Sequence, residues 1–282
     1  MVRPTGGEDN FDLAGYGFGT SSSGGVVTQL CSLIGNAIHM AYLRAPGLSS
    51  DVRLAKPIVW QMGLLFSQDA FRQVCTVNLL ARYLHSTELP KRILVIGDGH
   101  GILSALLHAR YPEAKICLID LGAVLFFQAF HLRKAFPQAT QSVVDEDSSD
   151  GENSVFQFCP AELLDRLPAD PVDIALNVAS MQEMDPSAIS NYFSVLRIHG
   201  TRLFYCCNRL EKRMPGGEIT RFMDYPWSAQ DEHLVDELCP WHQWFFGYGS
   251  SPHVEAFGLP LPLMHRFAST CWHRLTRLSR TA

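Results

Sequence analysis

The chain has 282 residues, of which 47% are hydrophobic, so it can bury a substantial core and is not a globally disordered protein. The formal net charge is −5, and residues 145–153 alone carry five acids and no base, so the composition gives no reason to expect nucleic-acid binding. No run of about 18 apolar residues occurs, so we expect neither a transmembrane helix nor a membrane partner.

The first 90 residues are predicted to form a flexible N-terminus and a helical cap. Residues 1–25 are rich in Gly and Ser and lack the charged and apolar regions of a signal peptide, so we expect a cytoplasmic protein. Apolar spacing predicts a helix over 26–45 and a helical stretch over 57–85 that is long enough to be two helices, with Pro57 in its first turn. The sequence leaves open whether these helices cover a binding cleft or form a packing surface or the surface of a homodimer.

From residue 91 to residue 282 we expect a single core, because strand-like and helix-like segments now alternate. The first strand, "RILVIG", is a continuous apolar run, which is typical of a central parallel strand covered on both faces. The alternation predicts an α/β fold with a Rossmann-like, doubly wound, mostly parallel sheet. The predicted strands are 92–97, 114–121, 154–159, 172–179 and 201–208, and the predicted helices are 102–111, 123–136, 161–167 and 186–198.

The pattern is weaker after residue 208. It predicts a long loop over 209–228, either a strand or a helix over 266–275, and a solvated basic end over 273–282. Eight cysteines form no CxxC pair and several lie in apolar runs, which indicates buried thiols rather than disulfides or a zinc site. His233 and His242 likewise lack metal-ligand spacing, so we predict structural or exposed roles for them and no metal site.

The segment "ILVIGDGHGILSALL" leads from the first strand through Gly97, Gly99 and Gly101 into a helix. A dinucleotide fingerprint would need its third glycine at position 102, which is Ile, and the Gly-Lys-Ser/Thr of a P-loop is also absent. Asp120 ends the second strand, where a carboxylate can accept hydrogen bonds from both hydroxyls of a ribose. A ribose held without a phosphate cradle indicates S-adenosylmethionine. The alternative is a glycine turn that serves only tight strand–helix packing.

Three segments, 93–137, 172–193 and 208–227, resemble the sugar O-methyltransferase family, a branch of the class I S-adenosylmethionine-dependent methyltransferases. The resemblance implies a Rossmann-like core that transfers the cofactor methyl group to a hydroxyl of a glycosylated small molecule and releases S-adenosylhomocysteine. The usual loop of these enzymes has an acid two residues before the first glycine. Here that position is Val95, and Asp98 inside the loop is the candidate replacement.

Contacts to the cofactor are expected from the glycine loop and from the carboxyl ends of the strands. Phe158, Cys159 and Pro160 would line an adenine slot, and Glu162 would reach the exocyclic amine. For Phe158 the alternative is ordinary packing at the strand end. The predicted cofactor-binding residues are Gly97, Asp98, Gly99, His100, Gly101, Asp120, Leu121, Cys159, Pro160, Asn177 and Ser180.

A sugar hydroxyl needs a general base, and Glu183, which follows the fourth strand, is the leading candidate. Its alternative role is that of a first-turn acid of the next helix, whereas Asp185 is predicted to be the N-cap of that helix. Asp224 is the second candidate base. A divalent cation held by Glu183 and Asp224 could also acidify the hydroxyl, but no ligand spacing indicates one. The predicted acceptor-binding residues are Gln182, Asn208, Arg209, Arg221 and Tyr225, next to Trp227, which is either an acceptor platform or a buried lid residue.

Two other functions remain open at this point. The first is methylation at nitrogen or carbon, or another reaction of the bound sulfonium. The second is a non-catalytic protein on a methyltransferase scaffold, an alternative that Val95 supports because fold alone does not determine function.

Overall fold

The computed structural model describes residues 26–84, 89–145, 154–167, 170–214, 216–247, 253–256, 258–267 and 269–279. The N-terminal segment that we predicted to be flexible and nearly all of the acidic window at 145–153 lie outside the described residues.

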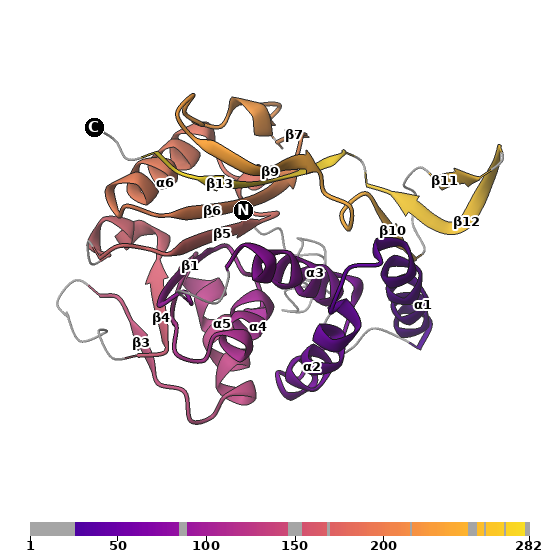
Figure 1. Cartoon of the computed structure of the whole chain (residues 1–282), viewed down its shortest axis with the longest axis horizontal. Helices are drawn as coiled ribbons and strands as arrows, with labels where there is room; N and C mark the ends of the chain where they lie inside the picture. Colours follow the sequence, from indigo (N-terminus) through magenta and orange to yellow (C-terminus); the bar gives the residue numbers. More distant parts are fainter. Residues whose placement is uncertain are drawn as a thin grey trace, which may run out of the picture.

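An eight-stranded sheet forms the centre of the molecule (Figure 1). The strands are β1 Arg92–Ile96, β2 Lys115–Asp120, β3 Gln141–Val143, β4 Phe156–Pro160, β5 Ile174–Val178, β6 Leu203–Arg209, β9 Glu232–Leu238 and β13 Cys271–Arg277. Their order is β3-β4-β2-β1-β5-β6-β13-β9, and only β13 runs antiparallel to its two neighbours. The predicted Rossmann-like, mostly parallel sheet is therefore confirmed.

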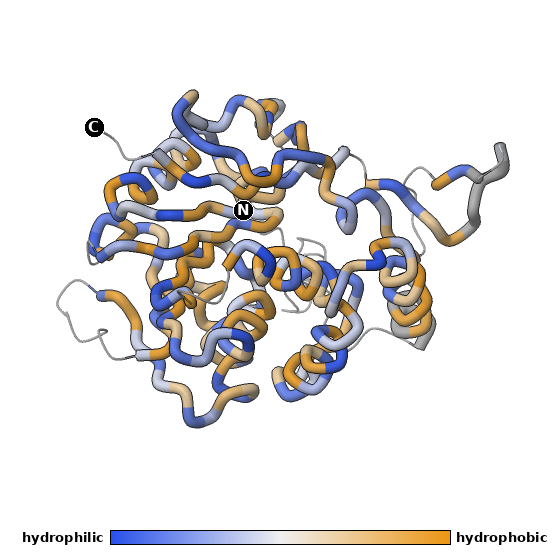
Figure 2. The backbone as a smooth tube through the Cα atoms, in the orientation of Figure 1, coloured by the Kyte–Doolittle hydropathy of each residue, from blue (hydrophilic) through white to orange (hydrophobic). Residues whose placement is uncertain are grey.

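Helices cover both faces of this sheet, as expected for a doubly wound fold. One face packs against α4 Ile102–Arg110 and α5 Gly122–Ala135, and the other packs against α6 Pro186–Ile198 and the 3₁₀ helix η3 Ala161–Arg166. Successive residues of β1 alternate between two hydrophobic cores: Ile93 and Val95 face one, and Leu94 and Ile96 face the other. Figure 2 shows the apolar residues concentrated in the central strands and in the helices beside them.

Three helices precede the sheet: α1 Val26–Leu43, α2 Leu48–Gln61 and α3 Gln68–Tyr83. The expected first-turn position of Pro57 is wrong, because α2 already begins at Leu48 and Pro57 lies inside it. Pro57 lacks the N–H that would bond the carbonyl of Arg53, but it is exposed and close to the helix end, where water can satisfy that carbonyl. Helix α3 contacts α4, and α2 contacts α4 and α5, so buried side chains of α2 and α3 belong to the same hydrophobic core as one face of the sheet.

The C-terminal part is more regular than its sequence indicated. The predicted loop at 209–228 contains a hairpin, β7 Glu211–Arg213 with β8 Ile219–Arg221, followed by the 3₁₀ helix η5 Phe222–Asp224. The basic end predicted to be solvated forms most of β13, where His273 and Arg274 are buried. A small second sheet contains β10 Trp244–Phe246, β11 His253–Ala256 and β12 Leu259–Arg266. None of the described helices is both long and apolar enough to cross a membrane.

Candidate functional site

The three-glycine loop follows β1 at the carboxyl-terminal edge of the sheet, where the ends of the central strands β1 and β5 lie side by side. The strand order changes direction between these two strands, and in open α/β sheets ligands bind outside the carboxyl ends at such a point. The φ angles of Gly97, Gly99 and Gly101 are 73°, 59° and 81°. A Cβ atom at Gly97 would lie 2.1 Å from Oγ of Ser180, so close packing requires this glycine whether or not a ligand binds.

Asp98 is directed at the start of α4 rather than away from the protein. Its Oδ1 accepts a hydrogen bond from the N–H of Leu103 at 3.0 Å, and its Oδ2 accepts one from the N–H of Ser104 at 2.7 Å. Burial raises the pKa of this carboxyl to about 7, although the hydrogen bonds with Ser104 and Leu103 act in the opposite direction. The carboxyl group therefore satisfies two backbone N–H groups at the helix start, one with each oxygen.

Asp120 ends β2 beside the glycine loop. Its Oδ1 accepts a hydrogen bond from the N–H of Leu121 at 2.9 Å, and its Oδ2 accepts one from the side-chain amide of Gln128 at 2.7 Å. The N–H of Gly99 is a further partner. Burial raises the pKa of Asp120 to about 6, against the effect of these donors, so the carboxylate is mostly ionised at neutral pH. Donors from Leu121, Gln128 and Gly99 thus set the orientation of this carboxylate at the carboxyl end of β2.

The expected adenine slot is divided between the two faces of the sheet. Cys159 belongs to the hydrophobic core that includes η3, and Phe158 belongs to the core on the opposite face, so strand-end packing explains Phe158. Pro160 pairs in register with Asp120, and Leu121, which precedes α5, has 62% of its surface exposed. Leu121 is therefore an apolar side chain in solvent directly beside the ribose-binding candidate, whereas Glu162 is exposed on η3.

Two asparagines join the carboxyl ends of β1, β5 and β6. Asn177 donates from Nδ2 to the carbonyl of Ile96 at 3.0 Å, and its Oδ1 accepts from Nδ2 of Asn208 at 2.8 Å. Oδ1 of Asn208 in turn accepts from the N–H of Gln182, whose Oε1 accepts from the N–H of Arg209. Asn177, Asn208 and Gln182 are buried, so the predicted cofactor and acceptor contacts here form a satisfied network that holds the strand ends together.

Glu183 lies at the end of the 3₁₀ helix η4 Met181–Glu183 and is exposed. Its Oε1 accepts from Nζ of Lys212 on β7 at 2.5 Å, so it forms an ion pair rather than a cap. Asp185 is the N-cap of α6, as predicted, and accepts from the N–H of Ala188 at 2.8 Å. The side chain of Arg209 is half-buried at the end of β6.

The residues predicted as an acceptor platform separate into exposed and buried groups. Arg221 and Asp224 are exposed, 3.9 Å apart, and Arg221 also contacts Glu211. Tyr225 is buried, and the indole N–H of Trp227 donates to the carbonyl of Phe222 at 3.2 Å within the same hydrophobic core. The contacts of Trp227 are those of a packed residue.

Three residues at this edge were not singled out in the sequence. Gln128 reaches Asp120 from the second turn of α5, and its buried Oε1 has no hydrogen-bond partner in the part of the chain that the structure describes. Tyr192 on α6 is buried close enough to Asp120 and Cys159 for their charges to act on its hydroxyl; burial and these charges raise its pKa to about 12. Ala179 has a φ of 60° directly after β5, a conformation that non-glycine residues rarely adopt. Helical spacing alone does not show which residues of a helix lie above a neighbouring strand end, so it does not mark Gln128 or Tyr192. An alanine likewise gives no sequence signal for a positive φ.

His100, predicted as a cofactor contact, is half-buried in the glycine loop. Its ring lies edge-on to that of His131 on α5, with the centroids 5.2 Å apart. Burial lowers the pKa of His100 to about 4, so the ring is neutral at physiological pH.

No protein-family model and no curated protein matches this sequence. Among solved structures, coclaurine N-methyltransferase bound to N-methylheliamine and SAH is 9% identical with a TM-score of 0.42; the match covers 59% of this chain and 49% of that chain, so this chain spans about half of that protein. The methyltransferase domain of bacterial CtHen1-CN is 12% identical with a TM-score of 0.41, covering 73% of this chain and 97% of that one. An rRNA methylase from Escherichia coli is 13% identical with a TM-score of 0.42, covering 82% and 77%. Similarities this low assign neither an acceptor nor a reaction.

Proposed function

We propose that this protein is an S-adenosylmethionine-dependent methyltransferase that acts on a hydroxyl of a sugar or glycosylated small molecule. The observation that carries the cofactor part is the position of Asp120, an oriented and mostly ionised carboxylate beside a three-glycine loop at the switch point of the sheet. The acceptor part rests on the resemblance of three sequence segments to the sugar O-methyltransferase family.

The residues at this edge fit a nucleoside sulfonium. Asp120 would accept the ribose hydroxyls, the glycine loop leaves the backbone accessible to the methionine chain, and exposed Leu121 would cover one face of adenine. Gln128 is fully buried and orients Asp120 from α5, and its Oε1 has no hydrogen-bond partner among the described residues. Cys159 and Pro160, on the neighbouring strand, would border the adenine from its other side.

When bound, S-adenosylmethionine supplies an electrophilic methyl group on a good leaving group. The protein must then align the acceptor oxygen and remove its proton, and alignment alone is worth several kcal/mol. Glu183 remains the leading base: its ion pair with Lys212 is exposed and can be exchanged for an acceptor hydroxyl. Asp224 is the second candidate, at the exposed end of η5. Arg209 and Arg221 are the remaining side chains proposed to contact the acceptor.

One observation favours a second candidate function. Val95 is buried in the sheet, and Asp98, the acid that would replace it, is directed at the start of α4 and has its pKa raised by burial to about 7, which makes it a weaker partner for a cationic amino group. A site without an acid for the cofactor amino group supports a non-catalytic protein on this scaffold. Methylation at nitrogen or carbon is the remaining alternative and would use the same cofactor site.

Cofactor binding is tested with the full chain by thermal unfolding with S-adenosylmethionine or S-adenosylhomocysteine at millimolar concentration. A ligand at one hundred times its dissociation constant stabilises the folded state by about 2.7 kcal/mol, so we expect a clear rise in Tm. Asp120→Asn should abolish the rise, and Asp224→Asn, which removes an exposed carboxylate from another element, should keep it. No shift for the unmodified chain with either compound would contradict the proposal.

The acceptor is tested by incubating the chain with S-adenosylmethionine and a set of glycosylated metabolites. Mass spectrometry should detect the gain of one methylene, and Glu183→Gln should reduce turnover by about 10²–10⁴-fold while cofactor affinity stays unchanged. Product formation only with amine acceptors would replace the oxygen assignment by nitrogen methylation. Cofactor binding without any product from any acceptor class would favour the non-catalytic alternative.

A further inference from the structure

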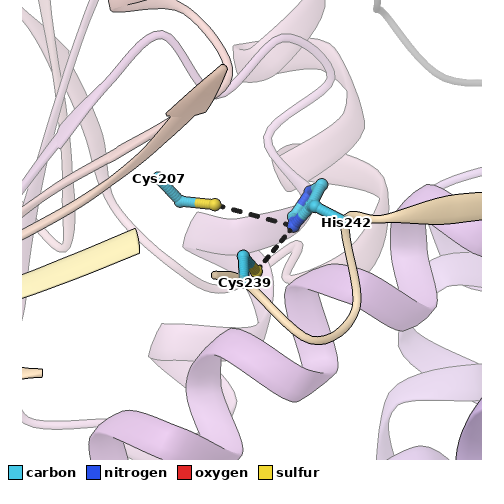
Figure 3. Close-up of side chains that lie close together, drawn as sticks. All are labelled: Cys207, Cys239 and His242. Atoms are coloured by element: carbon cyan, nitrogen blue, oxygen red, sulfur yellow. Dashed lines mark hydrogen bonds between the residues drawn. The ribbon is translucent and has the colours of Figure 1, made fainter. Parts of the chain in front are cut away.

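Cys207, Cys239 and His242 converge in the interior from different parts of the chain (Figure 3). Cys207 lies near the end of β6, and Cys239 and His242 lie in the turn directly after β9. Nδ1 of His242 is 3.6 Å from Sγ of Cys207 and 3.2 Å from Sγ of Cys239, and all three ligand atoms lie within 4.8 Å of one another. The exposed fractions of these residues are 1%, 0% and 8%. Among the described residues, this is the group of three His, Cys, Asp or Glu side chains whose ligand atoms lie close enough together to hold one metal ion.

We propose that Cys207, Cys239 and His242 bind one zinc ion, or a divalent cation of the same preference. Zinc bonds of about 2.3 Å to sulfur and about 2.0–2.1 Å to nitrogen place neighbouring ligand atoms of a tetrahedral site about 3.5–3.8 Å apart. The two sulfur–nitrogen distances are close to that spacing without rearrangement. Two thiolates and one imidazole are also a ligand set that zinc prefers.

The hydrogen-bonding capacity of the cluster supports a cation. Both sulfur atoms are directed at the same ring nitrogen, which can accept only one hydrogen bond or carry one proton. An ion between the three atoms satisfies all of them at once. Binding would release the thiol protons to solvent.

The site has a structural task. Pro240 and Trp241 lie between Cys239 and His242 in the chain. The carbonyl of Trp241 accepts from Nε of Arg72 on α3 at 3.0 Å. An ion would therefore fasten the β9–β10 connection to β6, next to the point where α3 already holds it. This proposal is independent of the proposed function.

Cobalt substitution tests the proposal on the reduced, full-length chain. We expect one equivalent of Co²⁺ to produce a thiolate-to-cobalt charge-transfer band and the visible bands of tetrahedral cobalt, both removed by one equivalent of Zn²⁺. Cys207→Ser, Cys239→Ser and His242→Gln should each weaken Co²⁺ binding at least tenfold. The matched control is Cys206→Ser: Cys206 is equally buried on the same strand but belongs to the core on the opposite face of the sheet.

A measurement on the unmodified chain keeps the proposal testable if a variant does not fold. X-ray absorption of the zinc-loaded protein should show two sulfur atoms at about 2.3 Å and at least one imidazole nitrogen at about 2.0 Å. A shell of oxygen and nitrogen alone, no Co²⁺ binding by the reduced chain, or equal loss in Cys206→Ser would each overturn it. The proposal would also be overturned if the isolated chain contained a Cys207–Cys239 disulfide and still bound no metal after that disulfide was reduced.

Discussion

The side-chain amide of Gln128 donates a 2.7 Å hydrogen bond to Oδ2 of Asp120, so a residue on α5 orients the carboxylate at the end of β2. Asp120 is the residue on which the proposed cofactor site depends most. Its geometry is therefore set by two elements, β2 and α5, and by the glycine loop.

Replacing Gln128 with Leu should weaken binding of S-adenosylhomocysteine by about 10–100-fold, because a hydrogen bond to a charged group is worth about 1.5–3 kcal/mol. Isothermal titration calorimetry measures the effect. Gln141→Leu is the matched control, since Gln141 bonds the carbonyl of Ala129 at the edge strand and does not contact Asp120. Equal affinities of Gln128→Leu and the unmodified chain would show that Asp120 does not need this orientation.

Gly97→Ala should destabilise the protein through two separable effects. The positive φ costs about 1–2 kcal/mol for a residue with a Cβ atom, and the new methyl group would also collide with Ser180. Urea unfolding should show that adding Ser180→Gly restores the steric part but not the conformational part. If the double variant were as stable as the unmodified chain, the backbone at residue 97 would have moved out of the left-handed region.

Asp98 should make stability depend on pH. Burial raises its pKa in the folded chain to about 7, above an unfolded value of about 3.9, so the folded state binds this proton more tightly. The stabilising contribution is complete below pH about 4 and is lost as the pH rises through about 7. Between pH 4 and pH 8, the unfolding free energy of the unmodified chain should therefore fall relative to that of Asp98→Asn, which carries no titrating group at this position.

Asp185 provides the contrast, because it also caps a helix but is exposed and its hydrogen bonds lower its pKa. Its contribution is lost only as the pH falls below about 4, so the difference for Asp185→Asn should be flat between pH 4 and pH 8. Urea denaturation at several pH values measures both series. Parallel curves for the two variants would contradict the buried-carboxyl explanation.

Asp231→Ala should cost about 3–5 kcal/mol, because it leaves the largely buried guanidinium of Arg197 without its carboxylate partner. Both oxygens of Asp231 accept from Arg197, at 2.9 and 2.8 Å, and one also accepts from the N–H and hydroxyl of Ser279. Chemical denaturation measures the loss. Glu232→Gln, which removes the adjacent but exposed ion pair with Arg277, should change stability by less than about 1 kcal/mol. Similar losses for both variants would show that burial does not matter here.

The sequence predicted the central fold because apolar periodicity is a local property. The run "RILVIG" appears as β1, and Asp120 ends β2 as its position after the apolar run implied. Prediction was poor after residue 208 because β9 and β13 pair with strands distant in the chain, and β13 was mistaken in part for a solvated tail. The edge-strand residues of β9 are mostly exposed, so no apolar run marks them.

The candidate site was predicted less completely than the fold. Position along the chain indicated that Asn177, Gln182 and Asn208 lie at strand ends, but their mutual hydrogen bonds require the register of β5 with β6. Likewise, nothing local to Asp98 indicates that both of its oxygens bond the amides of α4.

Neighbouring residues encode the alternation of strands and helices, the glycine turn and the strand-end carboxylate, so these features can be recognised from the amino-acid order. The partners of the polar side chains depend on the folded arrangement: Gln128 for Asp120, Lys212 for Glu183, and His242 for two cysteines separated by 31 residues of chain. A polar side chain needs a partner within hydrogen-bonding distance, and strand pairing and helix packing, not sequence separation, establish that distance.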